Sequence, residues 1–241
     1  MLGLQNNLFY ILLNLTNSID TIVVPRGAEY QAVCRGLQHA NVANVGVVAV
    51  PIGLDNISQT LSSYSKLLVN SQQILILGLC GSLSKFYEIG NVLLVQSCQD
   101  FDHNQIYLDP KLTAQIQDKL SLDLVTALTS DRVISQAKEK YQLAQQYQNE
   151  VVEMEGAGYI KELHRQGKSV AMLRVVSDSF TASIPNLDNA IDGEGNIKVI
   201  ATASAFFKQP IAAIRLIKGS LTGLKALEQI TAKLFASNQP K

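Results

Sequence analysis

Short apolar runs alternate with amphipathic stretches along this sequence, and the alternation limits the possible folds more than any other feature. The apolar runs are Thr21–Val24, Val45–Val50, Ile74–Leu77, Val92–Val95, Val125–Leu128 and Val170–Val176. Because their apolar residues are consecutive, both faces of each expected strand should be covered. The pattern predicts an α/β fold with helices on both faces of a central sheet.

Helical spacing of apolar residues is found between and after these runs. The expected helices are Glu29–Leu37, Ile57–Leu68, Leu112–Lys119, Ser135–Tyr147, Gly156–Gln166 and Ile191–Phe207. A last apolar stripe from Ile211 to Leu234 predicts a closing helix, in which Gly219 and Gly223 are candidate points of interruption.

The length of 241 residues fits one large α/β domain, and no linker or internal repeat divides it. We expect residues 21–237 to form this domain and residues 1–20 to form an N-terminal extension. The apolar run Leu8–Leu15 is too short to span a bilayer, and it lacks the basic leader of a signal peptide. No membrane span is predicted.

The charge balance argues against nucleic acid as a partner. Twenty lysine and arginine residues offset twenty acidic residues, and no basic block stands out. A small-molecule ligand is favoured instead. The 47% of hydrophobic and 17% of charged residues suit a chain that also buries surface in a homodimer or higher homo-oligomer.

The positions of the cysteine and histidine residues indicate the cellular compartment and whether a metal site is expected. The three cysteines are odd in number and widely separated, which favours a reducing compartment, the cytoplasm, over a disulfide framework. The three histidines lack the spacing of metal ligands, so no metal site is predicted. These residues are Cys34, Cys80, Cys98, His39, His103 and His164.

Ligands of α/β sheets bind beyond the carboxyl ends of the strands, so the residues that follow the runs are candidates for chemistry. The segments are Pro25–Glu29, Leu77–Leu83, Val151–Gly158 and Leu173–Phe180. In an extended chain Glu153 and Glu155 face opposite ways, so only one of them would enter a cleft. Purely structural roles stay open, because such carboxylates often cap helices or turns and such glycines often only turn the chain.

Two of these segments together resemble a known signature. Met154-Glu155 precedes a predicted helix, and Arg174-Val-Val-Ser-Asp178 lies beyond it. This pair resembles that of the purine and uridine nucleoside phosphorylases and of the methylthioadenosine/S-adenosylhomocysteine nucleosidases. Supporting matches in order and spacing extend the resemblance from Thr21 to Phe207.

The resemblance implies a phosphorylase/hydrolase-like, three-layer α/β/α fold around a twisted, mixed central sheet. It also implies an enzyme that cleaves the N-glycosidic bond of a nucleoside, and the Ser-Asp pair favours a purine base. No cofactor is implied, although a phosphorylase would use phosphate as co-substrate. Dimers and hexamers are the assemblies to expect.

The resemblance assigns roles to single residues. Asp178 would donate a proton to the leaving base, Glu155 would bond the ribose hydroxyls, and Met154 would pack against the sugar. Val133 stands where the family commonly has a stacking phenylalanine, and Phe180 is a possible replacement. The full set of substrate-binding candidates is Met154, Glu155, Gly78, Gly81, Ser177, Phe180, Val133 and Arg26.

The nucleophile distinguishes a phosphorylase from a hydrolase. Ile76 and Leu79 stand where hexameric purine phosphorylases carry an arginine and a serine or threonine, and an apolar pair cannot bind phosphate. Arg26 could supply a substitute charge. Glu29 is the nearest match to the glutamate with which the hydrolytic relatives activate water, so hydrolysis is favoured and Glu29 is a second catalytic candidate.

Two alternatives stay open. The tail from Gln209 onward resembles the hopanoid-associated phosphorylases, whose substrate would be an adenosyl group on a large lipid. The apolar pair and Val133 would also suit a nucleoside-binding protein that has lost turnover.

Overall fold

The computed structural model describes residues 19–53, 57–187 and 198–236. The run Leu8–Leu15, most of the expected extension, the first part of the expected helix Ile191–Phe207 and the end of the expected domain lie outside the described residues.

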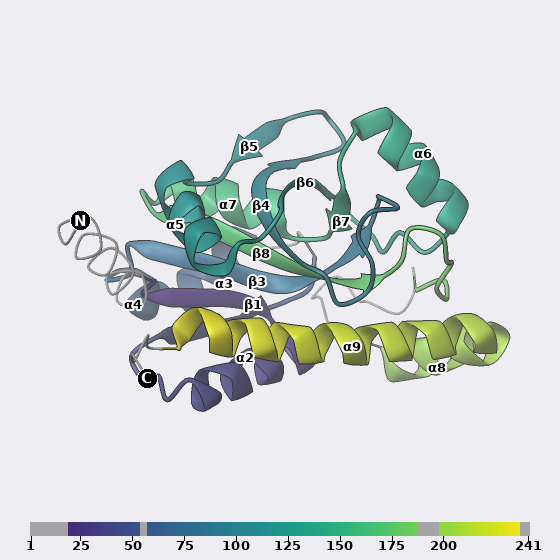
Figure 1. Ribbon diagram of the computed structural model, residues 1–241, viewed down its shortest axis with the longest axis horizontal. Coiled ribbons are helices and arrows are strands. Elements are labelled where there is room, and N and C mark those ends of the chain that lie inside the picture. The colour runs from purple at the N-terminus through teal and green to yellow at the C-terminus, as the bar shows by residue number, and fades with distance from the viewer. Residues whose placement is uncertain (1–18, 54–56, 188–197, 237–241) are drawn as a thin grey trace, which may run out of the picture.

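A mixed sheet of eight strands forms the centre of the fold (Figure 1). Its strands are β1 (Thr21–Pro25), β2 (Gly46–Val50), β3 (Gln73–Ser82), β4 (Val92–Gln99), β5 (Gln105–Tyr107), β6 (Leu124–Thr129), β7 (Val151–Glu153) and β8 (Ser169–Asp178). They run in the order β2-β1-β3-β7-β6-β4-β5, and β8 pairs with both β3 and β4. These pairings close β3, β7, β6, β4 and β8 into a barrel-like ring.

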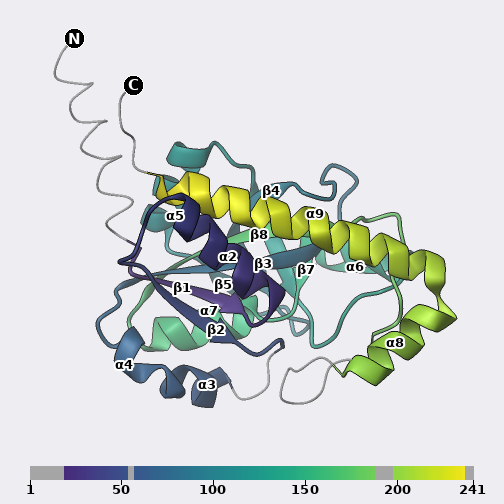
Figure 2. The same cartoon turned by 90° about the horizontal axis from the view of Figure 1, so that it is seen from below.

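Helices cover both faces of this sheet (Figures 1 and 2). They are α2 (Ala28–His39), α3 (Ile57–Ser63), α4 (Ser65–Leu68), α5 (Pro110–Leu120), α6 (Ala137–Tyr147), α7 (Gly156–Arg165), α8 (Val199–Lys208) and α9 (Pro210–Phe235). One hydrophobic core joins the sheet to α3, α4 and α7, and the other joins it to α2, α5 and α9. The predicted three-layer α/β/α class with a mixed sheet is confirmed.

The apolar runs of the sequence do not predict two of the strands, β5 and β7. β5 is short and its residues are exposed or half-buried, and β7 contributes only three residues to the ring. The expected helix Ile57–Leu68 also divides at Tyr64 into α3 and α4.

The closing helix is not interrupted at either candidate point, because α9 runs for 26 residues through both glycines. A methyl group at Gly219 would overlap the carbonyl oxygen of Ser177, and one at Gly223 would lie 3.0 Å from Cδ2 of Leu79. The missing side chains therefore let α9 lie directly against the end of β8. This contact places α9 beside the candidate site.

Candidate active site

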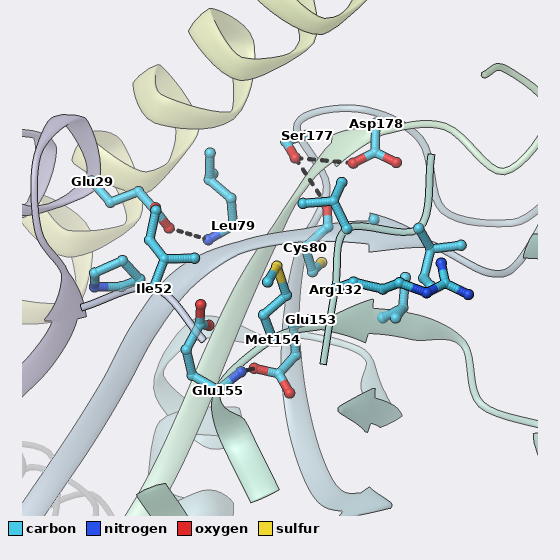
Figure 3. Close-up of a pocket in the computed structure, with 15 residues that line it drawn as sticks. Glu29, Ile52, Leu79, Cys80, Arg132, Glu153, Met154, Glu155, Ser177 and Asp178 are labelled. Carbon is cyan, nitrogen blue, oxygen red and sulfur yellow. Dashed lines mark hydrogen bonds between the residues drawn. The ribbon is translucent and has the colours of Figure 1, made fainter. Parts of the chain in front are cut away.

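A pocket of about 160 Å³ opens at the carboxyl ends of β1, β3 and β8 (Figure 3). Seven of the residues expected from the sequence line it. They are Glu29, Gly81, Val133, Met154, Glu155, Ser177 and Asp178. The closed strand ring explains why residues so far apart in the sequence meet here, since it brings the ends of β3, β7 and β8 together.

The expectation that only one of Glu153 and Glu155 enters the cleft is wrong, since both line the pocket, but the two differ in their partners. The Glu153 carboxylate is buried and accepts hydrogen bonds from Oγ1 of Thr129 and from the backbone N–H groups of Glu155 and Gly156, the last at 2.7 Å. It thereby satisfies the first amides of α7. Glu155 is the acid available to a ligand, because the only partners of its carboxylate among the described residues are the Gly53 N–H, at 3.3 Å, and Arg174, in a 3.5 Å ion pair.

Arg174 is a site residue that the sequence reasoning missed. It lies within β8, is 0% exposed, and its Nη2 donates to Oε2 of Glu153. The Nε and Nη1 groups are buried and have no hydrogen-bond partner among the described residues. A lone arginine inside the apolar run Val170–Val176 was the available signal, because a buried guanidinium needs anionic partners.

Glu29 enters the pocket from the first turn of α2. Its Oε1 accepts a hydrogen bond of 2.7 Å from the backbone N–H of Leu79. Burial raises the pKa of Glu29 above the ordinary value of 4.5, and the Leu79 N–H and Arg174 only partly offset this rise. Such a carboxylate is a stronger base than an exposed one.

The Glu155 carboxyl group is also perturbed. Burial raises its pKa to about 8, against the attraction of Arg174 and with added repulsion from Glu153 and Glu29. Three carboxyl groups thus surround one guanidinium at this end of the pocket.

Asp178 lies at the other side of the pocket, where β8 ends (Figure 3). Nζ of Lys140, a fully buried residue of α6, donates to Oδ2 of Asp178 and, at 2.8 Å, to the carbonyl oxygen of Ser179. Ser177 lies alongside, and its Oγ donates to the carbonyl oxygen of Cys80 at 3.2 Å. Lys140 was missed because a lysine in an amphipathic helix ordinarily faces solvent.

The sequence matches the family model described as the phosphorylase superfamily over residues 35–205. The chain belongs to the phosphorylase superfamily. The family resemblance is therefore confirmed, and with it the expectation of an enzyme that acts on N-ribosyl bonds. No curated protein matches the sequence.

Solved structures of similar fold include nucleosidases and a futalosine hydrolase. The methylthioadenosine nucleosidase of Arabidopsis thaliana is 14% identical with a TM-score of 0.64, over 89% of this chain and 93% of that chain. A futalosine hydrolase mutant of Helicobacter pylori is 18% identical with a TM-score of 0.60, over 87% and 96%. The methylthioadenosine/S-adenosylhomocysteine nucleosidase of the same species, in complex with a small molecule, is 19% identical with a TM-score of 0.59, again over 87% and 96%.

Three expected substrate-binding residues of this superfamily member do not line the pocket. Arg26 is exposed in the turn between β1 and α2. The ring of Phe180 lies beyond Asp178 and faces Tyr141, with 6.3 Å between ring centroids. Gly78 lies behind the pocket wall, where a methyl group would collide with Nη1 of Arg174 and lie 3.1 Å from Oε1 of Glu29.

The absence of a side chain at Gly78 therefore leaves space for the side chains of Arg174 and Glu29. Gly78→Ala should destabilise the protein by about 1–3 kcal/mol, because Arg174 cannot move without losing Glu153. It should also lower the rate of base release, because Glu29 is displaced. Urea unfolding and an assay of base release measure the two effects, and a variant that matches the wild type in both would contradict this role.

No group of three or more histidine, cysteine, aspartate or glutamate residues that could hold a metal ion occurs within residues 19–53, 57–187 and 198–236. Within the same ranges, no helix is long and apolar enough to cross a membrane.

Proposed function

We propose that this protein hydrolyses the N-glycosidic bond of a purine nucleoside. The observation that carries the proposal is the division of the pocket, with the half-buried base Glu29 on one side and Asp178 on the other (Figure 3). Asp178 is paired with the buried Lys140. Met154 and Glu155 lie between Glu29 and Asp178 and would hold the ribose. The purine base is suggested by the Ser177–Asp178 pair and by the similar structures named for methylthioadenosine.

Water suits the Glu29 side of the pocket better than phosphate does. Arg174 acts electrostatically on Glu29, but Glu153 and Glu155 already pair with this arginine. A phosphate dianion would meet this carboxyl cluster and the side chain of Leu79, and like charges in a buried site repel strongly. Ile76, at the other position where a phosphorylase would carry a phosphate ligand, is 2% exposed.

Glu29 would activate the attacking water. Its raised pKa brings its basicity closer to neutrality, which makes proton abstraction more efficient. The water oxygen forms a bond to C1′ of the ribose while Glu29 takes a proton from it. As the bond between C1′ and the base nitrogen breaks, positive charge develops on the sugar.

The Asp178–Lys140 pair would protonate the leaving base. The bond electrons pass to the base, which departs poorly as an anion. A proton from the lysine ammonium can pass through the Asp178 carboxylate to a ring nitrogen of the base, leaving a neutral lysine amine. The products are a free ribose and a neutral base, and the proton taken by Glu29 restores the pair through solvent.

Glu29→Gln should lower the rate of base release by about 10²–10⁴-fold, because glutamine cannot take a proton from water. The rate of the wild type should fall as the pH is lowered through the raised pKa of Glu29, and the variant should lack this dependence. A pH–rate profile of each protein measures the effect. An unchanged profile in Glu29→Gln would remove Glu29 from the mechanism.

A panel of nucleosides tests the proposed function itself. Adenosine, inosine and methylthioadenosine are compared with uridine, and the released base is quantified by chromatography. We expect release from at least one purine nucleoside and not from uridine. Cleavage of uridine alone would contradict the purine assignment, and tight binding with no release from any nucleoside would indicate a binding protein.

A further inference from the structure

The α8–α9 hairpin, Val199–Phe235, carries large apolar side chains that no other described part of the chain covers. Ile200 is 87% exposed and Phe207 is 89% exposed. Along α9 the exposed apolar residues recur at spacings of three and four, so they share one face. We call the whole set the apolar row, and it consists of Ile200, Phe207, Ile211, Ile214, Ile217 and Leu221. Soluble monomers rarely expose so many large apolar side chains together.

Every charged residue in the stretch of sequence that contains this row, Lys198 to Lys225, is basic. The stretch from Lys198 to Lys225 contains five of the chain's 20 lysine and arginine residues and none of its 20 acidic residues. All five are exposed, and those on α9 lie on the same outward face as the apolar row. These residues are Lys198, Lys208, Arg215, Lys218 and Lys225. The hairpin therefore presents an apolar and cationic surface in a chain whose overall charge is zero.

The hairpin is held at one end and free at the other. The C-terminal half of α9 is anchored in the core through Leu227, Ile230 and Leu234 and packs along α2. The part of α9 that precedes Gly219, together with α8, projects beyond the sheet (Figures 1 and 2). A projecting surface of this kind can meet a flat partner without obstruction from the rest of the fold.

We propose that the hairpin docks this protein on the surface of an anionic lipid bilayer. Helices that lie in a membrane interface combine large apolar side chains with lysine and arginine, and anionic headgroups attract the basic residues. The hairpin lies on the bilayer rather than spanning it, since no described helix is long and apolar enough to cross. A second copy is a poorer occupant, because a two-fold contact would bring the same basic side chains face to face.

Docking would leave the catalytic pocket next to the bilayer. Arg215, Lys218 and Gly219 of α9 line a second pocket of about 280 Å³, which shares Asp178 with the first. The proposal does not depend on the reaction, because lipid binding can be measured without a substrate.

Sedimentation with vesicles tests the docking. The full chain is mixed with vesicles of phosphatidylcholine alone or of equal parts phosphatidylcholine and phosphatidylglycerol. We expect binding to the anionic vesicles only, weakening as salt is raised. A triple variant, Lys208→Gln with Arg215→Gln and Lys218→Gln, should bind about 100-fold more weakly. The control triple, Lys66→Gln with Lys111→Gln and Lys138→Gln, changes exposed lysines elsewhere and should bind as the wild type does.

The apolar row is tested separately. Phe207→Ser with Ile211→Ser and Ile214→Ser should weaken binding by at least about tenfold, whereas Phe86→Ser, at a residue 76% exposed outside the hairpin, should not. The apolar triple should retain the wild-type rate of base release from a dissolved nucleoside, which shows that it folds. Binding that is absent, equal on neutral vesicles or unaffected by the hairpin variants would overturn the proposal. So would a dimer that only the apolar triple dissociates, since a second copy would then cover the row.

Discussion

Asp178→Asn should lower the rate of base release by about 10²–10⁴-fold while leaving nucleoside binding within a few-fold of the wild type. Asparagine cannot relay a proton to the base, but its carbonyl oxygen can still accept from the Lys140 ammonium, which is fully buried. The fold around the pocket should therefore persist. Single-turnover base release and calorimetric binding of a nucleoside measure the two quantities separately.

Val133→Ala is a suitable control for this variant, because it shortens another pocket-lining side chain without removing an ionisable group. It should affect binding more than the rate of bond cleavage. If Asp178→Asn retains the wild-type rate, Asp178 and its lysine partner have no part in the departure of the base.

Arg174→Met should cause the largest loss of stability, about 3–5 kcal/mol. Methionine roughly fills the volume of the arginine stem, but the Glu153 carboxylate then remains buried without its cation. Glu153 also holds the amides that open α7, so the damage should reach the segment that carries Glu155. Urea unfolding of the variant and the wild type measures the difference.

A double variant separates charge from packing. Adding Glu153→Gln to Arg174→Met should recover much of the lost stability, because the amide is neutral and can still bond Thr129. The double variant should remain inactive, since Arg174 also lies beside Glu155 and Glu29. Equal stability of Arg174→Met and the wild type would show that the carboxyl cluster does not depend on this arginine.

The strands and layers follow from the sequence because burial on both faces of a sheet requires consecutive apolar residues. Five of the six predicted runs lie within strands of the structure, and the sixth, Val45–Val50, begins one residue before β2. β5 and β7 depend on pairing with neighbouring strands rather than on their own composition, so periodicity does not reveal them. Gly219 and Gly223 are a second case in which local sequence misleads. The low helix propensity of glycine predicts a break, but here the close contact between α9 and the end of β8 requires a residue without a side chain.

The sequence predicts the site residues that follow the strand ends, but it does not predict the buried residues that hold them in place. Met154, Glu155 and Asp178 lie at the pocket because they follow strands that meet at one edge of the sheet. Alternation predicted that only one of Glu153 and Glu155 enters the cleft, but both are buried and line the pocket. The bonds that hold Glu153 to Thr129 and Arg174 leave Glu155 as the acid open to a ligand. Such partners are distant in the sequence, so the local spacing of residues does not predict them.

The dependence of base release on phosphate tests the central claim most directly. The protein is freed of phosphate, incubated with a purine nucleoside that it cleaves, and assayed with and without added phosphate, while the sugar product is identified by mass spectrometry. Cleavage by water predicts the same rate in both conditions and free ribose as the product. Strict dependence on phosphate, with ribose 1-phosphate as the product, would contradict the account.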